Sequence, residues 1–339
     1  MGPVGVVMPA FNASRWIEAS LASLQAQTVT TWCCVVVDDG SQDTTAAIVQ
    51  DIAASDARIV LTRQANMGVA AARNLGFRHL ANDVQEILLL DSDDLLVPDA
   101  VAALAEQLAL RPDAVGVFGL AEYIDEVGNE GARGLHSSVQ CARRTRRGFR
   151  FVALPVGEDS TFADIALYGP IWPSAVGLHR LAAIESVGGF DPTVPLLSDW
   201  DLYLKMSRLG PFAMIDRQVA WYRRHDANLT SDPVANSAAR LAVAHRAWHD
   251  PANTPAQRRF IGRSWWLIQA SETLALFRGV LSALKRRQPR RAARASLACL
   301  VNAYTLTRVR PRAPGRVTAA GLMSRNDSAD RQQRRRVTT

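Results

Sequence analysis

Short apolar runs recur along the first part of the chain and predict the strands of a buried sheet. The runs are Val4–Met8, Cys33–Val37, Arg58–Leu61 and Ile87–Leu90. Continuous runs of this length are typical of strands buried on both faces. Stretches with apolar residues at helical spacing separate them, such as the one with Ile17, Leu21 and Leu24 on one face. This alternation predicts an α/β fold with a Rossmann-like, doubly wound sheet.

Polar residues precede two of the expected helices and suit the capping of a first turn. Asn12 or Ser14 would cap the first helix, and Ser198 would cap a later one. The apolar face of that later helix would contain Leu202, Met206 and Leu209. We therefore expect both helices to begin at a hydrogen-bonding side chain.

Carboxylates directly follow two of the predicted strands. Asp38 and Asp39 end the second apolar run, and Asp91, Asp93 and Asp94 follow the fourth. In open α/β sheets, ligands bind beyond the carboxyl ends of the strands. Like charges this close repel one another, so a bound cation would relieve them. A solvated acidic turn is the simpler alternative.

Two common nucleotide-binding motifs are missing from the sequence. The first strand leads into PAFNAS, which lacks the glycines of a GxGxxG turn, and no GxxxxGK[ST] loop occurs. A nucleotide could still bind at the acidic strand ends, with one carboxylate accepting from base or ribose and another holding a metal that bridges a diphosphate. Zinc is disfavoured because no Cys or His flanks these acids.

Charge divides the 339-residue chain into two parts. Residues 235–339 contain 21 basic and 4 acidic residues, whereas the preceding part contains 18 basic and 28 acidic ones. We expect a domain over 1–234 that carries the motifs and a basic helical extension over 235–310. Residues 311–339 are rich in arginine and small residues and predict a disordered tail.

The basic extension has three interpretations. As a helix, it would align two sets of residues at i, i+3, i+4 and i+7. The sets are Arg287, Arg290, Arg291 and Arg294, and Leu297, Leu300, Val301 and Tyr304. Such a segment could bind an anionic membrane surface, or pack on the first domain and leave its arginines in water. Nucleic acid is not expected as a partner, because no recognisable binding module accompanies the charge.

The cysteines and the apolar segments predict a cytoplasmic protein. The cysteines are Cys33, Cys34, Cys141 and Cys299. They show no metal-binding spacing, which favours reduced thiols, and the strand-like GVVMP at the start leaves no room for a signal segment. The apolar stretch Trp265–Leu284 contains Glu272 and Arg278, which argues against a membrane span. We expect a soluble protein, or one peripheral on the inner face of the membrane.

Several motifs, taken in order, are similar to those of family 2 glycosyltransferases, which have the GT-A fold. They are VVMPAFN, VVVDDGSQDTT, NMGVAAARNLG, LLLDSDD, GGFDP and SDWDLYLKM, spanning roughly Val4 to Thr230. The resemblance implies an inverting, metal-dependent sugar transfer from a nucleoside-diphosphate sugar, with a UDP-sugar expected, to a hydroxyl of a glycan or lipid-linked acceptor. It further implies a role in cell-surface polysaccharide or glycolipid biosynthesis. The nucleotide-sugar half would cover about 1–110 and the acceptor half about 111–234.

The resemblance assigns donor-side roles to residues at the strand ends. The nucleobase pocket would contain Pro9, Phe11 and Asp39. Asp91, Ser92 and Asp93 correspond to the DxD motif of the family, in which Asp91 would approach the ribose. Asp93 would bind Mn²⁺ or Mg²⁺, an ion that can neutralise an anionic diphosphate leaving group.

Arg73 and His225 each have two interpretations. Arg73 could add positive charge to the diphosphate pocket, or it could brace Asp38 or Asp39. His225, in WYRRHDANLT, resembles the histidine that some family members place near the metal or diphosphate. A lone histidine is, however, more often structural.

The acceptor side needs a base, and the resemblance places the catalytic aspartate at Asp199. The alternative is that Asp199 and Asp201 only complement a helix dipole. Trp200 and Trp172 could stack on a sugar ring, although a core position is favoured for each. The basic segment CARRTRRGFR over 141–150 suits either an acceptor loop or a solvated loop.

Two other functions remain open. One is a nucleotide-binding peripheral membrane protein without catalysis. The other is a sugar nucleotidyltransferase, which is disfavoured because the chain has no glycine-rich GxGTR-like opening.

Overall fold

The computed structural model describes most of the chain up to residue 300. The described residues are 2–129, 144–147, 150–153, 155, 157–168, 171, 173–226, 228–229, 232–289, 292–293, 296–297 and 299–300. The expected disordered tail over 311–339 and Trp172 lie outside them, as does part of the basic segment over 141–150.

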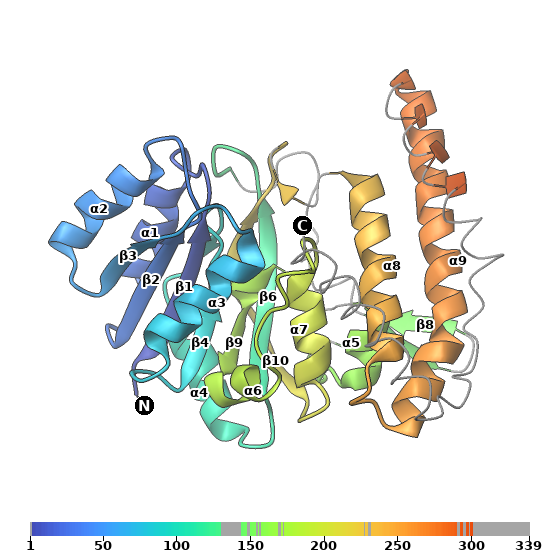
Figure 1. The fold of residues 1–339 in the computed structure, drawn as a ribbon, viewed down its shortest axis with the longest axis horizontal. Helices are drawn as coiled ribbons and strands as arrows, with labels where there is room; N and C mark the ends of the chain where they lie inside the picture. The colour runs from blue at the N-terminus through green and yellow to red at the C-terminus, as the bar shows by residue number, and fades with distance from the viewer. Residues whose placement is uncertain are drawn as a thin grey trace, which may run out of the picture.

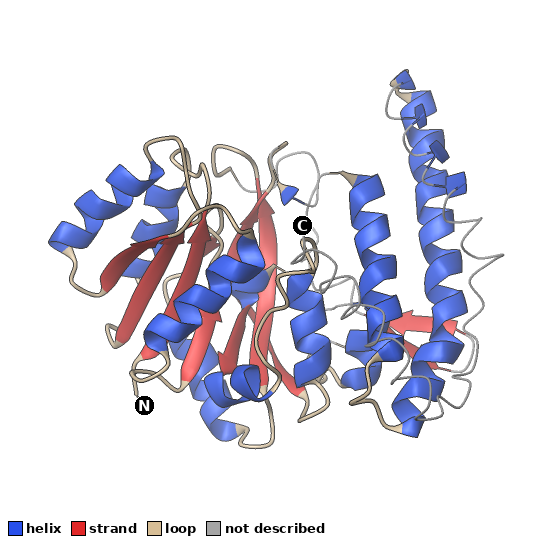
Figure 2. Ribbon diagram, in the orientation of Figure 1, coloured by secondary structure: helices blue, strands red, loops and turns tan. Residues whose placement is uncertain are grey.

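An eight-stranded mixed sheet forms the centre of the molecule (Figure 2). Its strands are β1 (Val4–Ala10), β2 (Trp32–Asp38), β3 (Ile59–Arg63), β4 (Glu86–Leu89), β5 (Leu95–Leu96), β6 (Gly116–Ile124), β9 (Gly177–Arg180) and β10 (Phe212–Arg223). They are arranged in the order β3-β2-β1-β4-β9-β6-β10-β5. The strands β1 to β4 are parallel to one another, as are β6 and β10, whereas β9 runs antiparallel to β4 and β6. The predicted α/β class with a doubly wound, mixed sheet is confirmed.

The helices follow the strands in the alternation that the sequence predicts. They are α1 (Ile17–Gln25), α2 (Thr45–Ser55), α3 (Val69–Leu80), α4 (Ala100–Leu110), α5 (Phe162–Tyr168), α6 (Leu181–Ser186), α7 (Ser198–Met206), α8 (Pro233–His249) and α9 (Pro255–Lys285), with a 3-10 turn, η2, at Ser174–Val176. A separate hairpin contains β7 (Arg144–Arg147) and β8 (Arg150–Ala153). Figure 1 shows α7, α8 and α9 one after another on the side of the sheet away from α2.

The predicted apolar runs build the core. Every residue of β1 is buried, and so are Val35, Val36 and Val37 of β2. The helix α3 lies close against β1 because Gly76 has no side chain: a Cβ there would come within 2.4 Å of a methyl carbon of Val7. This close packing positions the N-terminal end of α3 near the strand ends that carry the acids.

Both predicted helix caps are wrong. The first residue before α1 is Trp16, and no side chain caps this helix. Asn12 and Ser14 instead connect the β1–α1 turn to the segment after β2: the amide oxygen of Asn12 accepts from the Gln42 N–H at 2.9 Å. Ser198 lies inside the first turn of α7, after Leu197 in a left-handed conformation with φ of 58°. The capping signal of Asn12 failed because its side chain is used for a contact between loops.

The basic extension is partly packed on the preceding domain. The helix α8 contacts α7, and α9 contacts α8 and α5. Arg287 follows α9 with φ of 53°, so it does not continue this helix, and Arg290, Arg291 and Arg294 lie outside the described residues. In the described part of the chain, every helix is too short or too polar to cross a bilayer.

Candidate active site

The two acidic segments meet at one edge of the sheet. Because β2, β1 and β4 are parallel neighbours, their carboxyl ends point the same way. Asp38 is the last residue of β2, and Asp91 follows β4 closely. The backbone N–H of Asp39 donates to the carbonyl of Ala10 at 2.8 Å, which joins the ends of β1 and β2. The site is therefore assembled by strand order, as in other open α/β sheets.

Asp38 is fully buried and serves the structure of this edge. Its carboxylate forms an ion pair with Arg63 at 2.8 Å and accepts from the Ser41 N–H at 3.0 Å. The turn that follows contains Gly40 with φ of 81°, and a Cβ there would lie 3.0 Å from the Asn66 nitrogen. The Asp38 carboxylate is therefore used by contacts within the protein and is not accessible to a ligand.

Asp39 organises the loop before α3. One carboxylate oxygen accepts from the Met67 N–H at 2.9 Å and from the Gln64 side chain at 2.7 Å, and the other accepts from the Gly68 N–H at 2.8 Å. A carboxylate offers about four acceptor positions. One acceptor position of Asp39 therefore remains for a ligand. The other positions hold the loop before α3 in place.

The two other expected nucleobase residues differ in exposure. Pro9 is buried within β1, whereas the ring of Phe11, just beyond that strand, is 49% exposed. An aromatic ring exposed at the ligand edge of a sheet can stack on a planar group. Of the two, Phe11 is the residue with surface to offer a ligand.

Arg73 is buried and pairs with Asp91. Its guanidinium donates to Asp91 at 2.6 Å and to the Ser174 hydroxyl at 3.1 Å, and it lies 5.2 Å from the ring centre of Phe190. The expected alternative that it braces Asp38 or Asp39 is wrong. Burial lowers the pKa of Arg73, but Asp91 and also Asp199 raise it by more. Arg73 is thus a fixed cation between two carboxylates.

Asp91 lies in a strongly acidic neighbourhood. Withdrawal from water raises its pKa above the usual value, Arg73 opposes this rise, and neighbouring Asp93 adds to it. Ser92, next along the chain, uses its carbonyl to accept from the Ser20 hydroxyl at 2.9 Å. This contact fixes the loop after β4 to α1.

Asp93 and His225 face one another across the site. A carboxylate oxygen of Asp93 lies 3.0 Å from His225 Nε2, and the Asn228 side chain lies 3.4 Å from the same oxygen. The His225 ring stacks on Trp16, with ring centres 4.0 Å apart. His225 is therefore held rigidly, and the structure brings it together with Asp93 although 131 residues separate them in the chain. Sequence reasoning missed Asn228 and Trp16, since neither position carries a charge or a recognisable spacing.

The donor set of this pair fits Mn²⁺ or Mg²⁺. Two adjacent ligands of an octahedral ion with bonds of about 2.1 Å lie roughly 3 Å apart. The Asp93 oxygen and His225 Nε2 are separated by this distance. No cluster of three or more acidic, histidine or cysteine side chains suited to a metal occurs among the described residues. An ion here would take its other ligands from water and a diphosphate, which is how Mg²⁺ is commonly held.

Asp94 completes the acidic loop as an internal residue. It is fully buried and accepts from the Arg223 N–H at 3.0 Å, while the Arg223 side chain donates to the Asp93 carbonyl at 2.9 Å. Burial raises the pKa of Asp94 well above its usual range, and Asp93 and Asp91 contribute. Asp94 therefore ties the end of β10 to the loop and offers no surface to a ligand.

Asp199 lies in the first turn of α7, partly exposed, and interacts electrostatically with Arg73 and Asp91. One of its oxygens accepts from the Trp200 N–H at 2.8 Å. The neighbouring carboxylates are engaged elsewhere: Asp201 pairs with Lys205 at 2.6 Å, and Asp191 pairs with Arg246. Within the described residues, Asp199 has no ion pair of this kind.

Trp200 is a core residue, as favoured. It is 5% exposed, and its indole N–H donates to the Ile165 carbonyl at 2.5 Å. This contact anchors α7 on α5 and so fixes the turn that presents Asp199.

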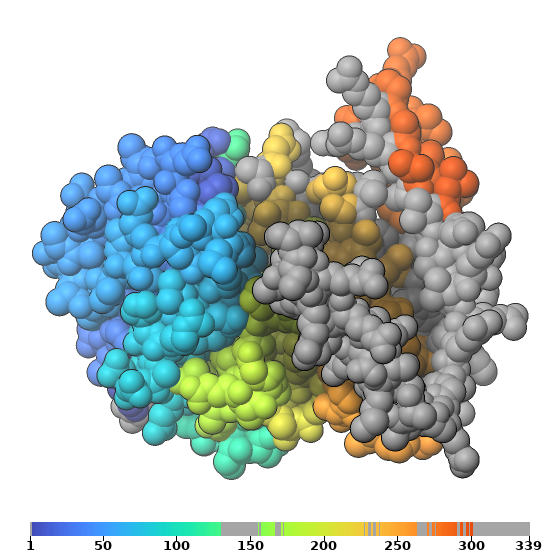
Figure 3. Space-filling view, in the orientation of Figure 1, coloured from blue at the N-terminus to red at the C-terminus, as the bar shows by residue number. Residues whose placement is uncertain are grey.

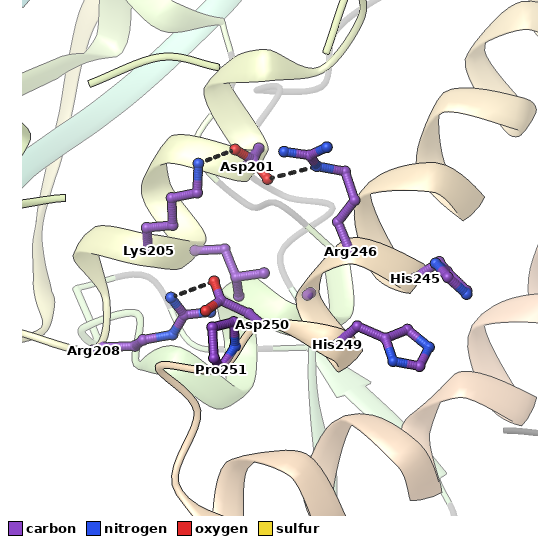
Figure 4. A pocket seen from close by; sticks show the side chains of 10 residues that line it. Asp201, Lys205, Arg208, His245, Arg246, His249, Asp250 and Pro251 are labelled. Atoms are coloured by element: carbon purple, nitrogen blue, oxygen red, sulfur yellow. Dashed lines mark ion pairs between the residues drawn. The ribbon is translucent and has the colours of Figure 1, made fainter. Parts of the chain in front are cut away.

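A cavity of about 400 Å³ lies between α7 and α8 (Figure 4). Lys205 and Arg246 both point toward Asp201, and Arg208 pairs with Asp250 at 2.8 Å. Its charged groups thus neutralise one another in pairs. The cavity is lined by the face of α7 that carries Asp201, and it is distinct from the strand ends that carry Asp91 and Asp93.

Residues 5–162 match the model described as glycosyl transferase family 2. Residues 5–162 therefore carry a family 2 glycosyltransferase domain. The match covers the strand ends with Asp39, Asp91 and Asp93, whereas Asp199 and His225 lie beyond it.

Related proteins extend the comparison. A chondroitin synthase of Escherichia coli is 28% identical over 214 residues, which are 63% of this chain and 28% of that protein. The UDP-Glc:α-D-GlcNAc-diphosphoundecaprenol β-1,3-glucosyltransferase of Escherichia coli is 38% identical over 95 residues, 28% of this chain and 36% of that protein. The chain thus spans only 28% and 36% of the length of these two relatives.

Solved structures share the fold of this chain. A mannosyltransferase of Pyrobaculum calidifontis, in complex with GDP-Man and Mn²⁺, superposes with a TM-score of 0.59 at 16% identity, over 91% of this chain and 87% of that one. The TarS protein of S. aureus, residues 1–349 with UDP-GlcNAc, gives a TM-score of 0.55 at 14% identity, over 86% and 89%. The fold is GT-A.

Proposed function

We propose that the protein is an inverting, metal-dependent glycosyltransferase. It would move a sugar from a nucleoside-diphosphate sugar to a hydroxyl of a glycan or lipid-linked acceptor, in cell-surface polysaccharide or glycolipid biosynthesis. One observation supports the proposal: buried Arg73 donates to Asp91 at 2.6 Å and also interacts electrostatically with Asp199. Binding and proton transfer can then take place at one site.

The donor would bind along the strand ends. Phe11 would stack on the nucleobase beside Pro9, and Asp39 would use its remaining acceptor position for a base N–H. Asp91, oriented by Arg73, would accept from the ribose hydroxyls, and Ser92 keeps the loop in place. Asp93 and His225 would hold Mn²⁺ or Mg²⁺, which stabilises the negative charge of the departing diphosphate.

Asp199 would act as the base. A sugar hydroxyl is a weak nucleophile, and a carboxylate that takes its proton as the new bond forms assists the attack. The acceptor oxygen bonds to the anomeric carbon while the bond from that carbon to the diphosphate oxygen breaks. Attack from the face opposite the diphosphate inverts the anomeric centre, and no covalent sugar–enzyme intermediate is required.

The comparisons support particular partners. The glucosyltransferase relative is named for a UDP-sugar donor and a diphosphoundecaprenol-linked acceptor, and the TarS structure contains UDP-GlcNAc. The mannosyltransferase structure contains GDP-Man. We therefore propose a UDP-sugar as donor and a lipid-linked glycan as acceptor. A cytoplasmic protein that associates with the inner membrane face through its basic extension would meet such an acceptor.

The test is binding and turnover of nucleotide sugars. Thermal unfolding is measured with UDP- and GDP-sugars, with and without Mn²⁺, because a ligand that binds the folded state raises the apparent stability. We expect one nucleotide sugar to stabilise the protein only with Mn²⁺, and Asp93→Asn to remove the metal-dependent part. Arg217→Gln, at an exposed ion pair far from the strand ends, is the control and should respond as wild type.

Product analysis separates the rival functions. Transfer, or slow hydrolysis, of the stabilising donor with release of nucleoside diphosphate supports a glycosyltransferase. Release of pyrophosphate from a nucleoside triphosphate and a sugar phosphate would indicate a nucleotidyltransferase. Donor binding without any turnover across an acceptor panel would indicate a nucleotide-binding protein without catalysis.

A further inference from the structure

A stripe of exposed apolar side chains runs along the C-terminal half of α9. It consists of Leu274, Phe277, Leu281 and Leu284, which are 51%, 52%, 47% and 58% exposed. An α-helix advances by about 100° per residue, so the four side chains occupy an arc of about 80° on one face. Figure 1 shows this half of the helix, in orange, projecting beyond the end of α8, and Figure 3 shows the same segment reaching beyond the sheet domain.

Elsewhere on α9, some of the described side chains pack inside the protein. Leu276 and Ala283, on another face, are each 7% exposed. The Cys299 thiol donates to the Thr273 carbonyl at 3.4 Å, so a residue beyond the helix contacts α9 next to the start of the stripe. Near its start, Ile261 belongs to the main core. The helix is therefore anchored at one end and presents an unpartnered apolar stripe at the other.

Positive charge adjoins the stripe. Arg278 and Lys285 lie within about 40° of Leu274 around the helix, and Arg286 and Arg287 follow at its end. All four side chains are exposed, and the described residues provide no ion-pair partner for them. Residues 255–300 contain ten basic residues and a single acidic one. Any surface that covers the stripe must tolerate this charge.

We propose that this stripe with its basic flank is a docking surface for an anionic lipid bilayer. Basic amphipathic helices bury their apolar face at the boundary of headgroups and acyl chains, while lysine and arginine attract anionic lipids. A bilayer supplies both an apolar phase for Leu274 and Phe277 and negative charge for Arg278 and Lys285.

Other occupants are less complementary. The 3-4-3 spacing of the stripe would suit a coiled coil with a second copy, but Arg278 and Lys285 of both copies would then meet without acids to balance them. The tail over 301–339 contains nine basic and two acidic residues, so its positive charge would be repelled by the basic residues beside the stripe. Nucleic acid supplies phosphates but no apolar phase for four large side chains.

Membrane docking would serve the proposed transfer to a lipid-linked acceptor, and this role of the surface rests on the proposed function. Docking through α9 would hold the site near acceptors that are anchored in the membrane. The evidence for the surface is independent of donor chemistry. Vesicle binding can be measured without donor or acceptor, and donor binding without vesicles, so either proposal can fail alone.

The test is co-sedimentation of the full chain with vesicles of phosphatidylcholine, alone or mixed with phosphatidylglycerol. We expect binding to the mixed vesicles that weakens as salt is raised. Phe277→Ser with Leu281→Ser should reduce it by at least about tenfold, because the buried apolar area is lost. Arg278→Glu with Lys285→Glu should reduce it by a similar factor through lost attraction.

Matched controls use equivalent residues away from α9. Leu110→Ser with Leu209→Ser removes two apolar side chains that are 69% and 54% exposed, and Arg78→Glu reverses one exposed charge on α3. These variants should bind the mixed vesicles as wild type does. Thermal unfolding of each variant verifies folding, which should persist because all the altered side chains are exposed.

Several results would overturn the proposal. Equal binding to neutral and mixed vesicles, or no loss in the stripe variants, would exclude docking through this surface. Self-association that disappears in the Phe277→Ser, Leu281→Ser variant, without vesicle binding, would identify a second copy as the occupant. Binding of DNA or RNA that depends on Arg278 and Lys285 but not on Phe277, again without vesicle binding, would identify a nucleic-acid surface.

Discussion

Arg73 is the residue through which the donor side and the acceptor side of the site interact. Its guanidinium is buried, contacts Asp91 at 2.6 Å and interacts electrostatically with Asp199. A buried cation needs neighbouring negative charge, since the interior disfavours an unpaired ion. Asp91 and Asp199 supply this negative charge, and the Arg73 guanidinium in turn positions both carboxylates. A substrate bound between them would therefore meet groups whose places are already fixed.

Asp199→Asn should separate binding from chemistry. Asparagine keeps the size of the side chain and can still accept from the Trp200 N–H, but it cannot take a proton from the acceptor. We expect turnover to fall by about 10²–10⁴-fold, the usual contribution of a general base, with donor affinity near wild type. Steady-state kinetics on the donor found by thermal unfolding measures both quantities.

Asp201→Asn provides the control for this variant. Asp201 lies in the same helix but pairs with Lys205, so its loss should affect stability more than turnover. Near-normal turnover in folded Asp199→Asn would exclude Asp199 as the base. A large loss of turnover in Asp201→Asn alone would move the role to that residue.

Individual residues of the site were predictable where charge follows a buried strand. Asp91 and Asp93 come after an apolar run, and the position of such a run in a parallel sheet fixes the edge at which they lie. Their contacts were not predictable in the same way. Arg73 pairs with Asp91 and not with Asp39, because that choice depends on how α3 packs on β1 through Gly76. His225 reaches Asp93 only through the return of β10 to the same edge.

Among the elements, β9 shows what apolar patterning leaves out. The runs that become β1, β2 and β4 are apolar throughout, whereas β9 reads GLHR, too short and too polar to predict. It is nevertheless central, pairing antiparallel with β4 on one side and β6 on the other. Its histidine, His179, is fully buried between the rings of Tyr203 and Phe212. Tertiary packing places this polar side chain in the core against its local preference.

His179 should make stability depend on pH. Both ring nitrogens are buried without hydrogen-bond partners, and burial lowers the pKa of His179 to about 3. The folded state therefore keeps the ring neutral while the unfolded chain, with a pKa of about 6.5, becomes protonated as the pH falls. Stability should accordingly be greatest above about pH 6.5 and decline between that pH and about 4.

The comparison variant for this prediction is His179→Phe. Phenylalanine keeps an aromatic ring beside Tyr203 and Phe212 and cannot be protonated. The free energy of unfolding, measured in denaturant at several pH values, should fall less steeply with pH in the variant. The slope is the readout, because Gly116 and Gly177 approach the ring closely and the larger side chain changes the absolute stability. Parallel slopes in wild type and variant would show that His179 does not contribute.

For the whole molecule, the question is how the acidic and basic parts of the chain are joined. The acidic part ends shortly after β10, and α8, which packs on α7, opens the basic one. Arg246 of α8 contacts both Asp191 and Asp201, and Arg208 pairs with Asp250 beyond α8. The charge asymmetry visible in the sequence thus reappears in the ion pairs of Arg246, whereas the Arg208–Asp250 pair has the opposite polarity. Charge alone predicted two parts, but only the packing of α8 on α7 shows that they are in contact.

Arg208→Gln should loosen this junction. The side chains of Arg208 and Asp250 are 12% and 21% exposed, and Arg208 also donates to the Asn253 side chain at 3.1 Å. Charged hydrogen bonds withdrawn from water contribute about 1.5–3 kcal/mol, so we expect a loss of stability of about that size. Because the contacts are local, amide hydrogens of α8 should exchange faster while those of β1 keep their protection.

An exposed ion pair gives the matched control for this last prediction. Arg217 and Asp99 pair with side chains that are 53% and 37% exposed, and pairs of this kind contribute about 0–1 kcal/mol. Arg217→Gln should therefore leave both stability and the exchange of α8 close to wild type. If Arg208→Gln behaved like this control, the ion pairs would not hold α8 to α7, and apolar contacts such as those of Val243 and Ala247 would have to account for the junction. If instead α8 and β1 lost protection together, α8 would be part of the same cooperative unit as the sheet, and the boundary suggested by charge would have no counterpart in folding.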